Sequence, residues 1–198
     1  MCLLLESIKV ENGRPCHLED HINRMNSSRR LLFGIHEPLV LSNQLFDKEI
    51  KGVAKCRIVY SDTIHSVDSQ PYSPRKIKTL YLIEKNDIDY THKYADRSAF
   101  QDLSVHAPDE DFLIVKNGYI TDTTFSNIVF FDGDQWVTPS TYLLNGTQRQ
   151  RLLREGRIVS RDIKIDNLDH FLYARVINAM LDFDSAPFIE ISAIRFAR

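Results

Sequence analysis

Two periodicities follow one another at the start of the chain. Residues 3–10 alternate between apolar and polar side chains, which predicts a β-strand, and Asn12-Gly13 supplies the residues of a tight turn. Apolar residues then recur at helical spacing from Leu18 to Leu32, and Gly34 is placed to end that helix. The pattern therefore predicts a strand, a turn and a helix in that order.

The next segments predict a second helix and two more strands. The helix is expected over residues 42–51 and the strands over 56–60 and 78–83. A polar stretch with Pro71 and Pro74 separates the two strands. The first half is thus predicted to be a strand–helix–helix–strand–strand unit.

The second half reads mainly as strands, after a polar candidate linker at residues 86–94. Turn signals separate four segments that predict the strands of a meander, at 112–115, 119–121, 127–131 and 135–138. Asn145-Gly146 opens a predicted helix that Gly156 ends. The chain then closes with a strand, a helix and two short strands, predicted at 157–165, at 166–173 and around Val176 and Phe188.

Length and composition bound the class of protein. The 198 residues suit one sizeable domain or two small ones, and the elements predict an α+β protein with lobes at 1–86 and 87–198. The formal net charge is −2, so there is no reason to expect a broad basic surface for nucleic acid or anionic membrane. A near-neutral chain can still carry a local cationic pocket for a small anion.

The cysteines and the opening segment indicate the compartment. Cys2, Cys16 and Cys56 are odd in number and show no CxxC spacing, which argues against a disulfide framework or a structural zinc site. The apolar residues before Glu6 are too few for a signal-peptide core, and no apolar run approaches the length of a membrane span. We expect a cytoplasmic protein that binds no metal and takes a small-molecule partner.

Three segments could carry chemistry, and each has an ordinary structural interpretation as well. Gly146 at a helix start could let backbone N–H groups approach an anion, or it could mark a plain loop-to-helix junction. Lys93 could form a Schiff base if nearby cations or burial lowered its pKa, or it could be a solvated surface lysine. Asp122 could accept a hydrogen bond from a heteroaromatic nitrogen, or it could simply form a turn.

Two histidines on one predicted helix face have the spacing of a pair of metal ligands. His17 and His21 stand four residues apart, but Leu18 occupies the place where the zinc-protease pattern needs glutamate, and no third ligand is evident. We interpret the pair as a polar helix face. The sequence contains no GxGxxG, Walker or GxSxG motif.

Taken in order, several segments resemble the class IV aminotransferase family of pyridoxal 5′-phosphate (PLP) enzymes, over nearly the whole chain. They are Leu5-Glu-Ser-Ile8 with His17-Leu-Glu-Asp-His-Ile-Asn-Arg24, His92-Lys93 with Arg97, Gly118-Tyr-Ile-Thr-Asp122 through Ser126-Asn127, Asn145-Gly-Thr-Gln-Arg149, and Asn178-Ala-Met180. The resemblance implies an α+β, two-lobed fold of the D-amino acid aminotransferase type, PLP fold type IV.

The resemblance also implies roles for the residues in the first two segments and for the acidic residue. Lys93 would form the Schiff base with PLP and act as the catalytic acid and base. Arg24 would contact the cofactor phosphate, and Asp122 would hold the pyridine nitrogen.

Further cofactor-binding residues are implied in the C-terminal lobe. Asn127 belongs to the same signature as Asp122. Gly146, with the backbone amides of Thr147 and Gln148, would cradle the phosphate, and Asn178-Ala179 would form another turn on the phosphate side.

The chain departs from the family pattern in two ways. Asp122 stands where the family usually has glutamate, so the carboxylate is one methylene shorter. The sequence also begins later than the family pattern, which implies a shortened N-terminal lobe. Arg97 and Asn178-Ala179 look closer to 4-amino-4-deoxychorismate lyase than to branched-chain aminotransferases.

The expected function is therefore a PLP-dependent lyase that forms 4-aminobenzoate, a folate precursor, and pyruvate. An aminotransferase for a D-amino or branched-chain amino acid is the first alternative. A non-catalytic family member and a phosphate-binding protein without PLP are the others. The family also implies a homodimer.

Overall fold

A computed structural model describes residues 2–105 and 107–196 of the chain. It is a mixed α+β structure, as the sequence predicts, and it forms two compact units. The first comprises Met1–Pro74 with His92–Arg97, and the second comprises Arg75–Thr91 with Ser98–Arg198. The described part contains no helix that is long and apolar enough to cross a membrane.

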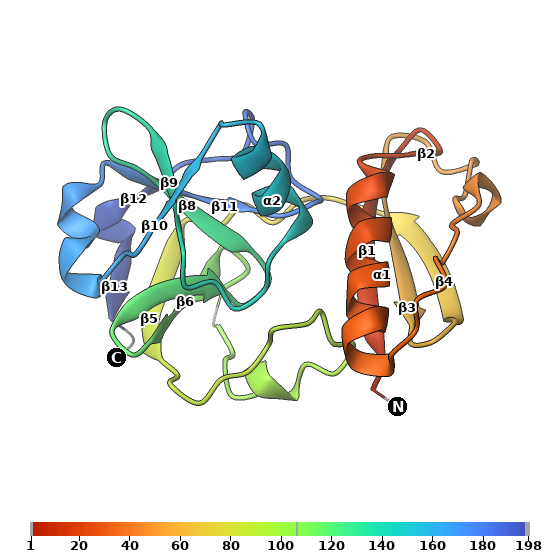
Figure 1. Ribbon diagram of the computed structural model, residues 1–198. Helices are drawn as coiled ribbons and strands as arrows, with labels where there is room; N and C mark the ends of the chain where they lie inside the picture. Colours follow the sequence, from red (N-terminus) through yellow and green to blue (C-terminus); the bar gives the residue numbers. More distant parts are fainter. Residues whose placement is uncertain (1, 106, 197–198) are drawn as a thin grey trace. The chain divides into compact units, whose positions relative to one another are not determined.

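The first unit is an antiparallel sheet with one helix beside it (Figure 1). Its sheet has the order β2-β1-β3-β4, formed by β1 (Leu4–Glu11), β2 (Arg14–Pro15), β3 (Val53–Tyr60) and β4 (Ile64–Pro71). The helix is α1 (Leu18–Phe33), which Gly34 ends in the left-handed conformation with a φ of 69°. Leu4 and Ile8 of β1 share a buried cluster with Met25 of α1, because the alternation of the strand turns one face toward the helix. The predicted strand, turn and helix are confirmed.

The segment around Lys93 is part of this first unit. The Leu5 amide donates to the carbonyl oxygen of Lys93 at 2.8 Å, and the Ala95 amide donates to that of Leu3 at 2.9 Å. These bonds pair residues 92–97 with the start of β1, whereas the sequence predicts them in a C-terminal lobe that begins at residue 87. The chain enters the second unit at residue 75, leaves it for these six residues and then returns.

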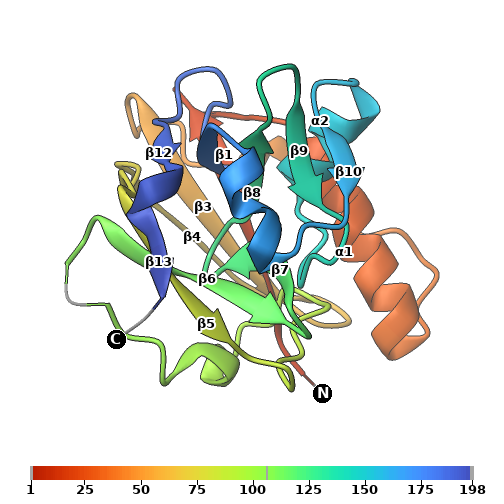
Figure 2. The same cartoon turned by 90° about the vertical axis from the view of Figure 1, so that its left-hand side faces the viewer.

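The second unit consists of two sheets with a shared core. One has the order β13-β5-β6-β7 (Figure 2), formed by β5 (Thr79–Glu84), β6 (Glu110–Lys116), β7 (Tyr119–Thr123) and β13 (Ile194–Phe196). The other has the order β10-β9-β8-β11-β12, formed by β8 (Asn127–Phe131), β9 (Trp136–Pro139), β10 (Val159–Arg161), β11 (Tyr173–Ile177) and β12 (Ile189–Glu190). Leu113 of the first sheet and Phe130 of the second lie in the same fully buried cluster.

The four predicted strands between 112 and 138 all form, but the predicted meander is wrong. The chain changes sheets between β7 and β8, through a tight loop in which the Thr123 amide donates to the Ser126 carbonyl at 2.8 Å. Both strands are buried on both faces, so their sequences do not alternate in a way that indicates which neighbour each would pair with. The predicted helix after Gly146 is confirmed as α2 (Thr147–Arg154).

Three other local predictions are corrected. The helix expected at 42–51 is only a 3-10 turn, Asn43–Leu45, because Ser42 and Asp47 hydrogen-bond backbone amides two residues ahead and so compete with a helix. The polar stretch before Pro71 is the edge strand β4, whose exposed residues hide its alternation. The helix expected at 166–173 is a 3-10 helix, Ile165–His170.

Candidate active site

The first unit contains a buried carboxylate with several hydrogen-bond partners. Glu6 of β1 is fully buried and accepts two hydrogen bonds from Arg24 of α1, from Nε at 2.8 Å and from Nη2 at 2.6 Å. The side chain of Arg24 is only 11% exposed. His21, one turn earlier on α1, places its Nδ1 2.7 Å from the same carboxylate. Glu6 therefore has two partners with good geometry, which a buried charge requires.

The pKa of Glu6 follows from these contacts. Burial raises the pKa of the carboxyl, but the positive charge of Arg24 and the hydrogen bonds from His21 and Arg24 outweigh burial and bring the pKa to about 2. Glu6 is therefore ionised at any physiological pH, and it holds the guanidinium of Arg24 in one orientation.

This ion pair predicts that the folded chain becomes less stable at low pH. Because the pKa of Glu6 is about 2 in the folded chain against an ordinary 4.5, its stabilising contribution is present above pH 4.5 and is lost as the pH falls toward 2. We expect this loss to be about 3 kcal/mol. Urea unfolding between pH 5 and pH 2 measures it, since the curve for Glu6→Gln should lack this component. If the free energy of unfolding changed equally with pH in the two proteins, Glu6 would not be the source of this pH dependence.

Lys93 lies among positive charges. Its side chain is partly buried, and burial together with the charge of Arg24 lowers the pKa of its amine to about 8 from an ordinary 10.5. Arg97 and Arg57 lower the pKa further, whereas Glu6 opposes them. At pH 7 roughly a tenth of the amine would be neutral, against a few parts in ten thousand for an ordinary lysine. Such an amine is suited to attack a carbonyl carbon.

In the second unit, Asp122 is the centre of a hydrogen-bond network. Its Oδ2 accepts from the backbone amides of Leu143 at 3.0 Å and Leu144 at 2.9 Å, and its Oδ1 accepts from Asn127 Nδ2 at 2.8 Å. Burial raises the pKa of Asp122 to about 6, although these donors act against it. An ionised carboxylate has about four acceptor positions, so one remains for a further donor.

Asn127 connects this network to the start of α2. Its Nδ2 also donates to the carbonyl of Leu144 at 2.8 Å, and a Cβ added to Gly146 would lie 2.1 Å from Asn127 Oδ1. The φ of Gly146 is −63°, an ordinary value, so close approach is what requires glycine here. Asp122, Asn127 and Gly146 are thus packed together.

The N-terminus of α2 offers backbone donors. No side chain caps it, and the first amides of a helix have no partner within the helix. Thr147 and Gln148 are buried, and Gln148 Nε2 is a buried donor without a hydrogen-bond partner in the described structure. This terminus combines polar donors with the positive end of the helix dipole, as an anion site would.

Asn178 contacts the loop between β7 and β8. Its Nδ2 donates to Ser126 Oγ at 2.7 Å, and its Oδ1 accepts from the amide of Met180 at 2.8 Å. Ala179, between them, is partly buried in the turn that follows β11. The second unit therefore brings together all the site residues predicted in it.

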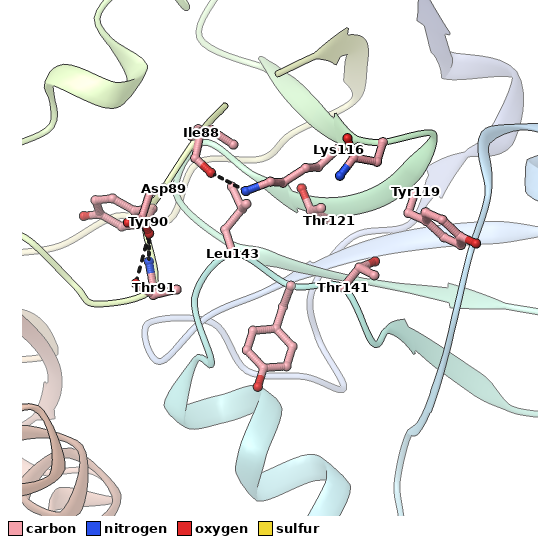
Figure 3. A pocket seen from close by; sticks show the side chains of 11 residues that line it. Ile88, Asp89, Tyr90, Thr91, Lys116, Tyr119, Thr121, Thr141 and Leu143 are labelled. Atoms are coloured by element: carbon pink, nitrogen blue, oxygen red, sulfur yellow. Dashed lines mark hydrogen bonds between the residues drawn. The ribbon is translucent and has the colours of Figure 1, made fainter. Parts of the chain in front are cut away.

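A separate pocket of about 320 Å³ lies in the second unit, lined by residues from 88–91, 116–121 and 141–143 (Figure 3). Lys116 Nζ crosses it to donate to the carbonyl of Ile88 at 2.7 Å. The pocket contains none of the predicted site residues and adjoins them through Leu143, whose amide binds Asp122. Among the described residues, no group of three or more His, Cys, Asp or Glu side chains is arranged to hold a metal.

Sequence reasoning missed Glu6 and misjudged His21. Glu6 stands between Leu4 and Ile8 on the buried face of an alternating strand, and a charge in that position was the available signal of a buried pair. The interpretation of His17 and His21 as a polar helix face is wrong, since His21 is buried against Glu6 and His17 precedes the helix with a φ of 50°. The roles assigned to Lys93, Arg24 and the residues of the second unit stay predictions.

The chain is similar to several known proteins in sequence and in fold. Residues 3–184 match the family model of class IV amino-transferases. An uncharacterized protein of Haemophilus influenzae is 33% identical over 190 residues, which cover 89% of this chain and 97% of that protein. The crystal structure of a proposed 4-amino-4-deoxychorismate lyase from Haemophilus somnus is 29% identical, with a TM-score of 0.78 over 91% of this chain and 97% of that one.

The fold is also similar to that of a more distant protein. The PLP-bound form of a hypothetical aminotransferase from Mycobacterium tuberculosis is 17% identical, with a TM-score of 0.75 over 98% of this chain and 81% of that one. The fold is thus that of the fold-type IV aminotransferases. The chain belongs to the class IV aminotransferase family.

Proposed function

We propose that this chain is a PLP-dependent enzyme whose reaction is that of a 4-amino-4-deoxychorismate lyase. The observation that carries the proposal is the Lys93 amine, whose pKa is lowered to about 8 by burial and by Arg24, in a chain of the class IV aminotransferase family. A lysine in this state can attach an aldehyde and can exchange protons near neutral pH.

The donor set fits PLP. Lys93 supplies the amine for the aldehyde carbon, and Arg24 supplies a guanidinium of fixed orientation for the phosphate. In the second unit, the uncapped start of α2 would offer the amides of Thr147 and Gln148 to a phosphate. Asp122 retains one acceptor position for the protonated pyridine nitrogen.

Lys93 and Asp122 would have different roles in the reaction. When bound, the cofactor supplies an electron-withdrawing ring that stabilises negative charge on the substrate. Lys93 takes a proton from the substrate and returns one, because its pKa allows both forms near pH 7. Asp122 is mainly ionised at pH 7 with a pKa of about 6, so its carboxylate would favour a proton on the pyridine nitrogen of the bound cofactor.

The lyase is favoured over the aminotransferase by two observations. The relative described as a proposed lyase is 29% identical over nearly its whole length, whereas the M. tuberculosis aminotransferase is 17% identical and shows fold alone. Arg97 and the Asn178-Ala179 turn also look like the lyase branch. A homodimer, a cytoplasmic location and a role in making a folate precursor are further parts of this proposal.

An absorbance spectrum with added PLP, followed by borohydride reduction and peptide mapping, tests the proposal. We expect a visible band and a reduced adduct on Lys93. Incubation with 4-amino-4-deoxychorismate should then release 4-aminobenzoate and pyruvate. Amino-group transfer to a 2-oxo acid without 4-aminobenzoate would favour the aminotransferase. The absence of both band and adduct would favour a non-catalytic family member.

A further inference from the structure

The segment that carries Lys93 and the residue Glu6 are joined through β1. The Leu5 amide holds the Lys93 carbonyl at 2.8 Å, and Glu6 is the next residue along that strand. Glu6, Arg24 and Lys93 all belong to the first compact unit. The position of the lysine backbone is therefore set by the same strand that carries the buried carboxylate.

Four charged groups act on the Lys93 amine, and each comes from a different segment of the first unit. Arg24 lies on α1, Arg57 on β3, Arg97 on the lysine's own segment and Glu6 on β1. Of these four, only Glu6 is negative. Arg24 has the largest effect of the four, and it is also the residue whose guanidinium Glu6 binds through two nitrogens.

We propose that Glu6 is a positioning residue, whose buried carboxylate holds the guanidinium of Arg24 in place, balances its charge and so controls the reactivity of the Lys93 amine. Without Glu6, three positive groups would act unopposed on the amine. They would disfavour its protonated form, and Arg24 would also lose its fixed orientation. The relevance of Glu6 to catalysis rests on the proposed function, but its effect on the amine does not.

His21 completes this arrangement as a second donor. An ionised carboxylate can only accept hydrogen bonds, so the His21 Nδ1 at 2.7 Å carries a proton and donates it. His21 thus helps to hold the Glu6 carboxylate in place.

The test is the pH dependence of chemical labelling of Lys93. The full chain, freed of any bound cofactor with hydroxylamine, is labelled with acetic anhydride across a pH series, and the Lys93 peptide is quantified by mass spectrometry. We expect the midpoint for Glu6→Gln to lie about one pH unit below that of the wild type. Arg24→Gln should move the midpoint the opposite way, to higher pH, and Glu6→Asp should stay near the wild type.

Glu11→Gln is the matched control, because Glu11 ends the same strand but is exposed and paired with Lys9. Its midpoint should equal that of the wild type. A purely structural role for Glu6 predicts the reverse shift, since a loosened unit would admit water and raise the midpoint toward that of an ordinary lysine. A midpoint for Glu6→Gln that rises, or that equals that of Glu11→Gln, overturns the proposal. The labelling needs no PLP, so its outcome is separate from the borohydride test of function.

Discussion

Lys93→Ala is expected to abolish the covalent attachment of PLP and to lower turnover roughly a thousandfold or more. The variant removes both the amine that would bind the aldehyde and the group that would move the substrate proton. The fold should not suffer. The pKa of Lys93 is lower in the folded chain than in an unfolded one, so below pH 8 its positive charge destabilises the folded state. The thermal midpoint of the alanine variant should equal or exceed that of the wild type.

The absorbance band, the borohydride adduct and 4-aminobenzoate formation measure this effect together. Lys76→Ala is the control, since Lys76 is exposed and should change none of the three. Cofactor absorbance and turnover that persist in Lys93→Ala would refute the catalytic role of Lys93. They would also remove the main support for the proposed function.

Gly146→Ala is expected to have the second largest effect, through a single methyl group. The new Cβ would lie 2.1 Å from Asn127 Oδ1, so the side chain of Asn127 must move. Asn127 cannot move without losing its bonds to Asp122 and to the carbonyl of Leu144. We expect a loss of about 1–3 kcal/mol in the free energy of unfolding. Because the start of α2 is displaced as well, PLP affinity should fall roughly tenfold or more.

Gly156→Ala separates this close contact from ordinary backbone strain. Gly156 has a φ of +67°, but no atom lies within 4 Å of an added Cβ. Its substitution should lower the free energy of unfolding by a similar amount, roughly 1–2 kcal/mol, through strain alone. PLP affinity should be unchanged. Denaturant titrations and absorbance titrations with PLP compare the two variants. Equal PLP affinities for Gly146→Ala and the wild type would show that the 146–148 segment does not hold the phosphate.

Local patterns predicted the elements better than their partners. β1 and α1 were predicted because alternation and helical spacing are properties of consecutive residues, and Gly34 ends the helix through its own φ. The edge strand β4 was missed because a strand with both faces largely exposed has no such alternation. The pairing of β7 and β8 with different sheets could not be predicted, since both strands are buried on both faces and neither alternates between buried and exposed residues.

In the candidate site, too, the sequence predicted the residues but not their contacts. The order of its motifs, from Arg24 through Lys93 and Asp122 to Asn178, was recognised in the sequence, and with it the family. The sequence also marked Gly146 as special, but only the fold shows that Asn127 Oδ1 fills the space a Cβ would need.

What the sequence by itself determined is therefore the class of protein, the main strands and helices, and the residues that resemble a PLP site. The tertiary structure alone decided that Glu6 binds Arg24, that residues 92–97 pair with β1, and that Leu143 and Leu144 hold Asp122. These contacts join residues 18 or more positions apart. Local periodicity specifies which face a side chain occupies, whereas the partner on that face is set by packing of the whole unit.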